Sequence, residues 1–258
     1  MPADALSQRQ RAAGAVARDA GRLACSYLAD LSTLRIALKG PQDVVTDADA
    51  AVERLIVAAL HAAFPDDTFL GEEGGGAPGE RCWVIDPIDG TANFARGLPH
   101  WCVSIAYAVA GRTEVGVIFD PNGDLLYSAQ RGKGASRNGS PIRVSGAVDI
   151  ARATVDIGYS SRAPVADFGL IMTRLLDAGA NVTQSGSAAL GLARVADGRL
   201  DGYAERHLYA WDALAGLLLV DEAGGRVNDF LAGDALTAGN MTIAATPALY
   251  PMLAGVLG

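Results

Sequence analysis

Residues 83–94 constrain this chain more than any other stretch. They read Trp-Val-Ile-Asp-Pro-Ile-Asp-Gly-Thr-Ala-Asn-Phe, so three apolar residues precede two carboxylates, a glycine and a threonine. The apolar residues predict a buried strand. We expect this strand to end at Asp86-Pro87, because proline lacks the N–H that a ladder needs. Two acids and a glycine at a strand end are suited to hold a hard cation with a phosphate bound to it.

The charge of the chain argues against a nucleic-acid partner. Its formal net charge is −8, and no cluster of lysines or arginines is present. Nucleic-acid-binding proteins normally carry a basic patch, so we expect no nucleic acid here. An acidic protein that acts on an anionic phosphate needs local positive charge, and a bound metal ion is one source of it.

The cysteines and the N-terminal residues favour a cytoplasmic protein. There are three cysteines without regular spacing, which argues against a disulfide framework and suits a reducing compartment. Arginines interrupt the apolar runs of the first 30 residues, so no signal peptide is expected. The longest apolar stretches, 101–110 and 213–220, are too short to span a bilayer, and we expect no membrane contact.

The apolar spacing changes between residues 1–147, here called the first half, and residues 148–258, the second half. The first half begins with two amphipathic helices and continues with strands that turn signals separate, which predicts an α+β subdomain. The second half alternates helices with strands, which predicts an α/β subdomain with a partly parallel sheet. The expected helices are 5–30, a helix that Thr46 and Asp49 cap, 168–176, 188–196 and 211–223, and the expected strands are 68–70, 83–85, 101–110, 114–120, 125–130, 181–184 and 200–204.

Three motifs in a fixed order suggest a family. The run Asp86-Pro-Ile-Asp-Gly-Thr91 resembles the signature of the inositol monophosphatase family of metal-dependent phosphatases. Gly71-Glu72-Glu73 upstream resembles a second signature, and Trp211-Asp212 with the Glu-Ala-Gly-Gly run at 222–225 resembles a third. The resemblance covers most of the chain and implies a layered αβαβα sandwich that hydrolyses phosphoric monoesters.

The resemblance also implies a cation site made of oxygen ligands. Such ligands suit Mg²⁺, and Mn²⁺ could replace it. Four carboxylates without a cation would repel one another, so an empty cluster should have raised pKa values. In this family pattern two ions are held, and waters near Glu72 provide for a third. The implied metal ligands are Glu72, Asp86, the Ile88 carbonyl, Asp89 and Asp212.

The catalytic residues that the resemblance implies are Asp49, Glu72 and Thr91. Thr91, with Asp49 behind it, would orient the attacking water or take its proton. From the residues alone, Asp49 is also explained as an acid that complements the helix dipole. In the same way, Glu72 is also explained as part of a solvated glycine-rich loop.

Substrate contacts are implied on both halves. The backbone amides of Gly90 and Thr91 would bind phosphate oxygens. Glu205 matches an acid that bonds substrate hydroxyls, although a single Glu at this position is also explained as surface charge. The implied substrate-binding residues are Asp89, Gly90, Thr91, Gly186, Ser187, Ala188, Glu205 and Asp212.

The leading hypothesis is a Mg²⁺-dependent phosphatase of myo-inositol 1-phosphate or a related polyol phosphate. Histidinol phosphate and 3′-phosphoadenosine 5′-phosphate are the alternative substrates, because phosphatases of both resemble this metal pattern. A different class stays open, in which the fold is kept as a regulatory protein that binds a macromolecule. The resemblance further implies a homodimer and inhibition by Li⁺.

Overall fold

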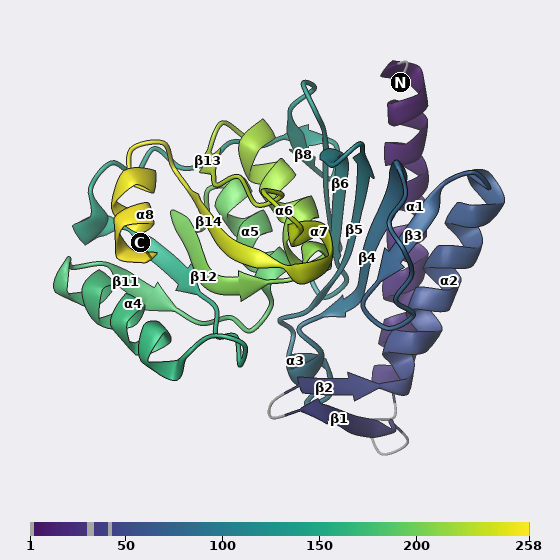
Figure 1. Ribbon diagram of the computed structural model, residues 1–258, viewed down its shortest axis with the longest axis horizontal. Helices are drawn as coiled ribbons and strands as arrows, with labels where there is room; N and C mark the ends of the chain where they lie inside the picture. Colours follow the sequence, from purple (N-terminus) through teal and green to yellow (C-terminus); the bar gives the residue numbers. More distant parts are fainter. Residues whose placement is uncertain (1–2, 30–33, 41–42, 258) are drawn as a thin grey trace.

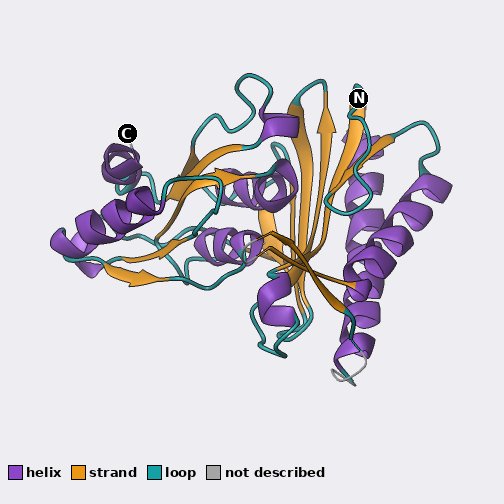
Figure 2. Ribbon diagram, turned by 60° about the horizontal axis from the view of Figure 1, so that its bottom comes forward, coloured by secondary structure: helices purple, strands orange, loops and turns teal. Residues whose placement is uncertain are grey.

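The computed structural model describes residues 3–29, 34–40 and 43–257, which form five layers of alternating helices and sheets. Figures 1 and 2 show two helices on one side, a large sheet, a middle layer of helices, a smaller sheet and an outer layer of helices. This is the αβαβα sandwich that the family resemblance implied, and the mixed α/β fold class is confirmed.

The first layer consists of α1 (Ala3–Leu28) and α2 (Asp47–Ala63), which cover one face of the large sheet. Alanines spaced three or four residues apart bury one side of α1, which lets the helix approach the strands closely. On α2, Val52, Ile56 and Leu60 are fully buried and pack into the same core. The predicted first helix is therefore present, and residue 30, its expected end, lies outside the described residues.

The large sheet has seven strands in the order β3-β4-β5-β6-β7-β8-β9. The pair β3–β4 is parallel and the other pairs are antiparallel. The strands are β3 (Thr68–Gly71), β4 (Arg81–Asp89), β5 (Cys102–Val109), β6 (Arg112–Asp120), β7 (Leu125–Gln130), β8 (Ala135–Arg137) and β9 (Ser140–Pro141).

The expectation that Asp86-Pro87 ends its strand is wrong, because β4 continues to Asp89. On one side, β3 pairs with β4 only as far as Ile85. On the other side, the register with β5 shifts between Asp86 and Asp89. Pro87 therefore lies where neither neighbour needs its missing N–H, and the strand tolerates it. Because of this irregularity, both acids of the motif lie at the C-terminal end of β4.

The small sheet belongs to the second half and has five strands in the order β11-β10-β12-β14-β13. As expected, it is partly parallel: β10 runs parallel to β11 and β12, whereas β14 is antiparallel to both of its neighbours. The strand expected at 200–204 instead spans 202–208, which places Glu205 inside it. The strands are β10 (Thr154–Ile157), β11 (Asn181–Thr183), β12 (Gly202–Leu208), β13 (Arg226–Val227) and β14 (Asn240–Ala245).

The middle layer consists of α5 (Ala188–Ala196) and α6 (Ala210–Glu222), which pack between the two sheets. Nine of the 13 residues of α6 are buried, with an unbroken run from Ala213 to Val220, as expected of a helix that is apolar on all sides there. Gly116 of β6 lets α6 approach the sheet, because a Cβ there would lie 2.7 Å from the Ala215 carbonyl oxygen. The outer layer, α4 (Val165–Asp177) and α8 (Tyr250–Leu257), covers the other face of the small sheet.

The remaining elements are short. The hairpin of β1 (Ile36–Gly40) and β2 (Asp43–Thr46), which the sequence did not predict, contacts α3 (Thr91–Phe94) (Figure 1). The predicted division between residues 147 and 148 falls between β9 and β10 and stays a prediction. None of the described helices has the length and apolar character needed to cross a membrane. The other short elements are a 3-10 helix (Ile150–Arg152) and α7 (Ala235–Ala238).

Candidate functional site

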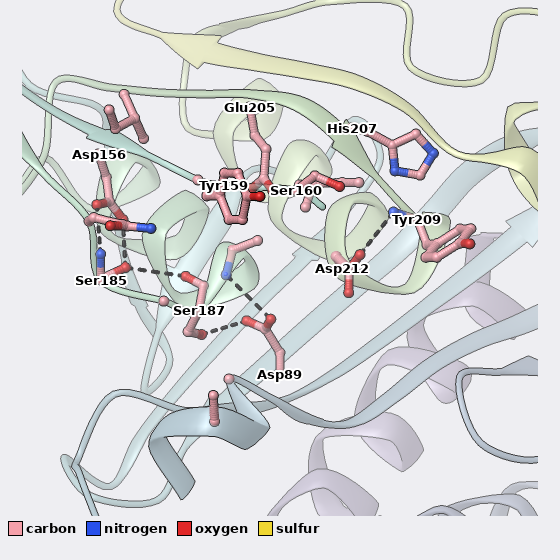
Figure 3. A pocket seen from close by; sticks show the side chains of 18 of the residues that line it. Asp89, Asp156, Tyr159, Ser160, Ser185, Ser187, Glu205, His207, Tyr209 and Asp212 are labelled. Atoms are coloured by element: carbon pink, nitrogen blue, oxygen red, sulfur yellow. Dashed lines mark hydrogen bonds between the residues drawn. The ribbon is translucent and has the colours of Figure 1, made fainter. Parts of the chain in front are cut away.

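A pocket of about 260 Å³ lies where the two halves meet. Its walls come from the ends of β4, β10 and β12 and from the loops that lead into α3, α5 and α6. Figure 3 shows polar side chains from these segments facing one another across it. It is lined by Val44, Glu72, Asp89, Gly90, Thr91, Ala92, Asp156–Arg162, Gln184–Ala188, Tyr203, Glu205, His207, Leu208, Tyr209 and Asp212.

Three acids form the centre of the site: Asp86, Asp89 and Asp212. Each offers a carboxylate oxygen, and these oxygens all lie within 4.8 Å of one another. Asp86 and Asp89 come from β4, whereas Asp212 comes from the first turn of α6, more than 120 residues later. The fold thus brings together acids that the sequence keeps far apart.

Backbone N–H groups hold two of these carboxylates. The Ile88 amide donates to Asp86 Oδ1 at 3.0 Å, a local turn that the irregular end of β4 permits. The Tyr209 amide donates to Asp212 Oδ2 at 2.8 Å, so Asp212 reaches back to the residue that precedes α6. The start of a helix also favours negative charge, because its free N–H groups carry partial positive charge.

Asp89 receives its hydrogen bonds from the start of α5. The Ser187 hydroxyl donates to Asp89 Oδ2 at 2.5 Å, and the Ala189 amide donates to the same oxygen at 2.8 Å. The Ala188 amide donates to Oδ1 at a longer 3.3 Å. The buried Cys102 thiol adds a weak contact of 3.7 Å to Oδ2. Figure 3 shows Ser187 and Asp89 pointing toward each other.

Desolvation raises the pKa of all three acids. For Asp86 the negative charges of Glu72, Asp89 and Asp212 raise the pKa further. For Asp212 the charges of Asp89 and Glu72 act in the same direction. The hydrogen bonds from the α5 segment offset part of the desolvation at Asp89, whose pKa nevertheless stays raised. The raised pKa values mean that keeping all three acids ionised at this site costs free energy.

The cluster fits a divalent cation. Among the side chains that the structure describes, no lysine, arginine or histidine forms an ion pair with Asp86, Asp89 or Asp212. Their donors are neutral N–H, O–H and S–H groups, which orient the carboxylates without cancelling their charge. An all-oxygen donor set of this kind is what hard cations such as Mg²⁺ prefer. The site can therefore bind a metal ion.

Glu72 lies at the pocket wall, close enough for its charge to raise the pKa of Asp86 and Asp212. It follows β3 in a tight turn, and its amide donates to the Ile85 carbonyl of β4 at 3.1 Å. The buried carboxylate of Glu53 on α2 accepts from the amides of Glu73 and Gly74 and so holds this turn in place. Sequence reasoning did not identify Glu53 as a support for the turn.

The predicted catalytic residues Asp49 and Thr91 are in contact. Asp49 is fully buried, and its Oδ2 accepts from the Thr46 amide at 2.8 Å and the Thr46 hydroxyl at 2.6 Å. The Thr91 hydroxyl lies 3.2 Å from Asp49 Oδ1 and 2.9 Å from the Ile88 carbonyl oxygen. Desolvation raises the pKa of Asp49, while the bonds from Thr46 lower it in part. This carboxylate can accept a proton that passes through Thr91.

Two predicted glycines occupy left-handed backbone positions. Gly90 has φ +95° and precedes α3, so the Thr91 amide lies at the start of a helical turn. Gly186 has φ +76°, and a Cβ there would lie 3.0 Å from Asn93 Nδ2. Both positions favour glycine, and both bring backbone close to the pocket. Ala188, which was predicted to contact substrate, lines the pocket, and its amide donates to Asp89 Oδ1.

Glu205 lies on the pocket wall opposite the first half. It is buried, and the Tyr203 hydroxyl donates to its Oε2 at 2.5 Å. Desolvation raises the pKa of Glu205 to about 8, and the Tyr203 hydrogen bond lowers it only in part. The alternative of a simple surface charge is therefore wrong for this residue. A carboxyl group that is protonated near neutral pH can donate as well as accept a hydrogen bond.

Several pocket residues were missed by sequence reasoning. Tyr203 shares a face of β12 with Glu205 because the two are separated by two positions, a signal that a longer predicted strand would have revealed. Asp156 follows a single apolar residue, Val155, in β10, and no motif surrounds it. No sequence motif identifies the segment 158–162, His207 or Tyr209 as lining a pocket.

Comparisons with known proteins agree with this geometry. A model of the inositol monophosphatase family matches residues 5–257. The Nus factor SuhB of Pasteurella multocida is 42% identical over 236 residues, which cover 89% of this chain and 88% of that protein. The extragenic suppressor protein suhB of Bartonella henselae has a TM-score of 0.87 at 34% identity, covering 94% of this chain and 95% of that one. An IMPase of Thermotoga maritima has a TM-score of 0.87 at 32% identity, covering 97% and 96%.

The name of the Pasteurella relative bears on one expectation. A protein called a Nus factor gives no support to the predicted absence of a nucleic-acid partner. The net charge of −8 is therefore not sufficient ground for that exclusion.

Proposed function

The chain belongs to the inositol monophosphatase family, and from this premise we propose that it is a Mg²⁺-dependent phosphatase of small polyol phosphates, with myo-inositol 1-phosphate as the leading substrate. The observation that carries the proposal is the group of three carboxylates whose oxygens lie within 4.8 Å of one another, with no ion pair to a cationic side chain among the described residues. Such a group at the wall of a pocket suits a phosphate ester that is bound through divalent cations.

In this proposal two or three Mg²⁺ ions bind at the acid cluster, and Mn²⁺ can replace them. When bound, they supply the positive charge that a phosphate and a leaving oxygen require, and they activate a water. The residues that would hold them are Glu72, Asp86, the Ile88 carbonyl, Asp89 and Asp212.

The protein's own groups handle the proton and the phosphate. The Thr91 hydroxyl orients the attacking water, and Asp49 accepts the proton through it, a role that the raised pKa of Asp49 supports. The amides of Gly90 and Thr91 bind phosphate oxygens at the start of α3. No covalent phosphoenzyme forms in this scheme.

The second half binds the part of the substrate that leaves. Glu205 faces the pocket and, with a pKa of about 8, both donates to and accepts from substrate hydroxyls. Gly186, Ser187 and Ala188 form the adjoining wall. A pocket of about 260 Å³ has room for a small cyclic polyol phosphate.

Steady-state hydrolysis of a substrate panel tests the proposal. The panel contains myo-inositol 1-phosphate, histidinol phosphate and 3′-phosphoadenosine 5′-phosphate, each with and without Mg²⁺. We expect the highest kcat/KM for the inositol ester. A kcat/KM about tenfold higher for histidinol phosphate, a preference of about 1.4 kcal/mol, would contradict the substrate assignment.

A second function has one observation in its favour, the Nus factor name of relatives. In this alternative the chain binds a macromolecular partner through its surface, and it can do so with or without catalysis. Pull-down with the wild type and with Asp89→Asn distinguishes the two functions. Partner capture that survives the substitution assigns the interaction to the surface rather than to the acid cluster.

Three further expectations accompany the phosphatase proposal: a homodimer, a cytoplasmic location and inhibition by Li⁺. Sedimentation velocity tests the first, and fractionation of cells tests the second. Assays with increasing LiCl at fixed Mg²⁺ test the third, with KCl at the same ionic strength as the control.

A further inference from the structure

The carboxylate of Asp89 belongs to the first half, but most of its hydrogen bonds come from the second. Ser187, Ala188 and Ala189 all donate to it from positions 98 to 100 residues later in the chain. Two of these donors and the Cys102 thiol converge on Oδ2, whereas Oδ1 has one bond of 3.3 Å. The orientation of this carboxylate is therefore decided by Ser187 and the first residues of α5.

The segment 183–187, which leads into α5, is itself held from both halves. In the second half, the buried carboxylate of Asp156 accepts from the Ser185 amide at 3.0 Å, the Ser185 hydroxyl at 2.6 Å and the Thr183 hydroxyl at 2.9 Å. From the first half, Asn93 Nδ2 donates to the Ser185 carbonyl at 2.9 Å. Figure 3 shows Asp156, Ser185, Ser187 and Asp89 as one connected series.

We propose that Ser187 is a positioning residue that fixes the Asp89 carboxylate for divalent cation binding, so that the cation affinity of the acid cluster depends on the segment 183–187. This inference rests on the proposed cation-dependent function. Neutral donors suit the role because they orient the carboxylate and leave its charge available to the cation. Loss of a hydrogen bond to a metal ligand typically lowers metal affinity by about 10- to 100-fold.

Ser187 also has a role in its own helix. Its hydroxyl oxygen accepts from the Leu190 amide at 3.4 Å and so caps α5. One hydroxyl can donate to Asp89 and accept from Leu190 at the same time. A role confined to the cap would alter the stability of α5 but leave cation affinity unchanged, which separates the two possibilities.

The test is Mn²⁺ binding to the full-length protein without substrate, measured by electron paramagnetic resonance of the free ion. We expect Ser187→Ala to raise the Kd for Mn²⁺ by about tenfold or more. Ser187→Thr keeps the hydroxyl and should restore the Kd to within about threefold of the wild type. Ser136→Ala serves as the control, because Ser136 is a half-buried serine on β8 whose hydroxyl donates to the Ser128 carbonyl rather than to a site acid.

Asp156→Asn provides a second variant, because it weakens the support of Ser185 and leaves Ser187 intact. We expect a smaller increase of the Mn²⁺ Kd, about three- to tenfold. A wild type that binds Mn²⁺ together with a Ser187→Ala variant of unchanged Kd would overturn the positioning role and leave the phosphatase proposal standing. A wild type that binds no Mn²⁺ would overturn both.

Discussion

The protein surrounds the buried acid Asp67 and the buried acid cluster of the pocket with opposite kinds of hydrogen-bond donor. Asp67, whose side chain is fully buried, is paired by Arg9 through two hydrogen bonds of 2.9 and 3.1 Å, and Arg81 lies 3.5 Å away. The Arg9 guanidinium in turn lies 4.4 Å from the ring centroid of Phe64 and 4.8 Å from that of Tyr107. Within the described part of the chain, Asp86, Asp89 and Asp212 accept hydrogen bonds from neutral donors only. The charge of a buried carboxylate is balanced when an arginine pairs with it, whereas a bound cation would relieve the repulsion among the pocket acids.

The difference also concerns which elements are joined. The Arg9–Asp67 pair ties α1 to the turn before β3 within the first half, where both partners stay covered. The acid cluster lies between halves and borders a pocket. Removing a partner should therefore cost stability in one region and activity in the other, and four predictions test this contrast.

The largest expected effect is on activity. Asp89→Asn removes a charged ligand from the cluster, and we expect kcat/KM for the phosphate ester to fall by at least about 10,000-fold, or about 5.5 kcal/mol. Circular dichroism and thermal melting should show an intact fold, because Asn keeps the shape and relieves repulsion. Residual activity near one tenth of the wild type would contradict a catalytic acid cluster.

The next effect is on stability. Arg9→Ala leaves Asp67 buried without its main partner, and we expect the free energy of unfolding to fall by about 3 to 5 kcal/mol. Urea denaturation measures this change. Arg22→Ala, which removes an exposed pair with Asp19, is the control and should cost less than about 1 kcal/mol. Equal losses in the two variants would remove the distinction between buried and exposed pairs.

Added Mg²⁺ should stabilise the whole folded protein through the acid cluster alone. At about 100 times its Kd, Mg²⁺ is expected to raise the free energy of unfolding by about 2.7 kcal/mol in the wild type. Arg9→Ala should show the same increase from its lower starting value, because its lesion is remote from the cluster. Asp89→Asn should show a much smaller one, and thermal melts with and without EDTA measure both. An undiminished increase in Asp89→Asn would place the stabilising ion elsewhere.

The smallest expected effect, counted per pH unit, is the pH dependence of stability. Glu205 ionises near 4.5 when exposed, and burial raises its pKa to about 8 in the folded protein. The folded state therefore binds the extra proton between these values, and stability should fall as pH rises through this window. One such group changes the free energy of unfolding by at most about 1.4 kcal/mol per pH unit. The slope should appear with EDTA present, and Glu205→Gln should reduce it; a stability that rises with pH would contradict this.

Much of the fold could be predicted because its signals are local. Alanine spacing predicts α1, the Thr46–Asp49 cap predicts the start of α2, and alternating segments predict the partly parallel second sheet. The path of β4 through Pro87 could not be predicted, because proline is tolerated there only through the pairing of β4 with its neighbours. The same holds for the length of β12, whose later residues pair with β14 across a register shift.

The sequence by itself determined which acids this protein has and in which motifs they occur, since motif spacing follows from the covalent chain. Only the tertiary structure decided how each acid is held. Asp67 is held by arginines, and Asp89 by a serine and amides from 98 to 100 residues away. Asp156 accepts from Ser185 in the loop that leads to that serine. The physical reason is that desolvation and hydrogen bonding depend on distances in space, which residues far apart in sequence set only after the two sheets and their middle helices have packed.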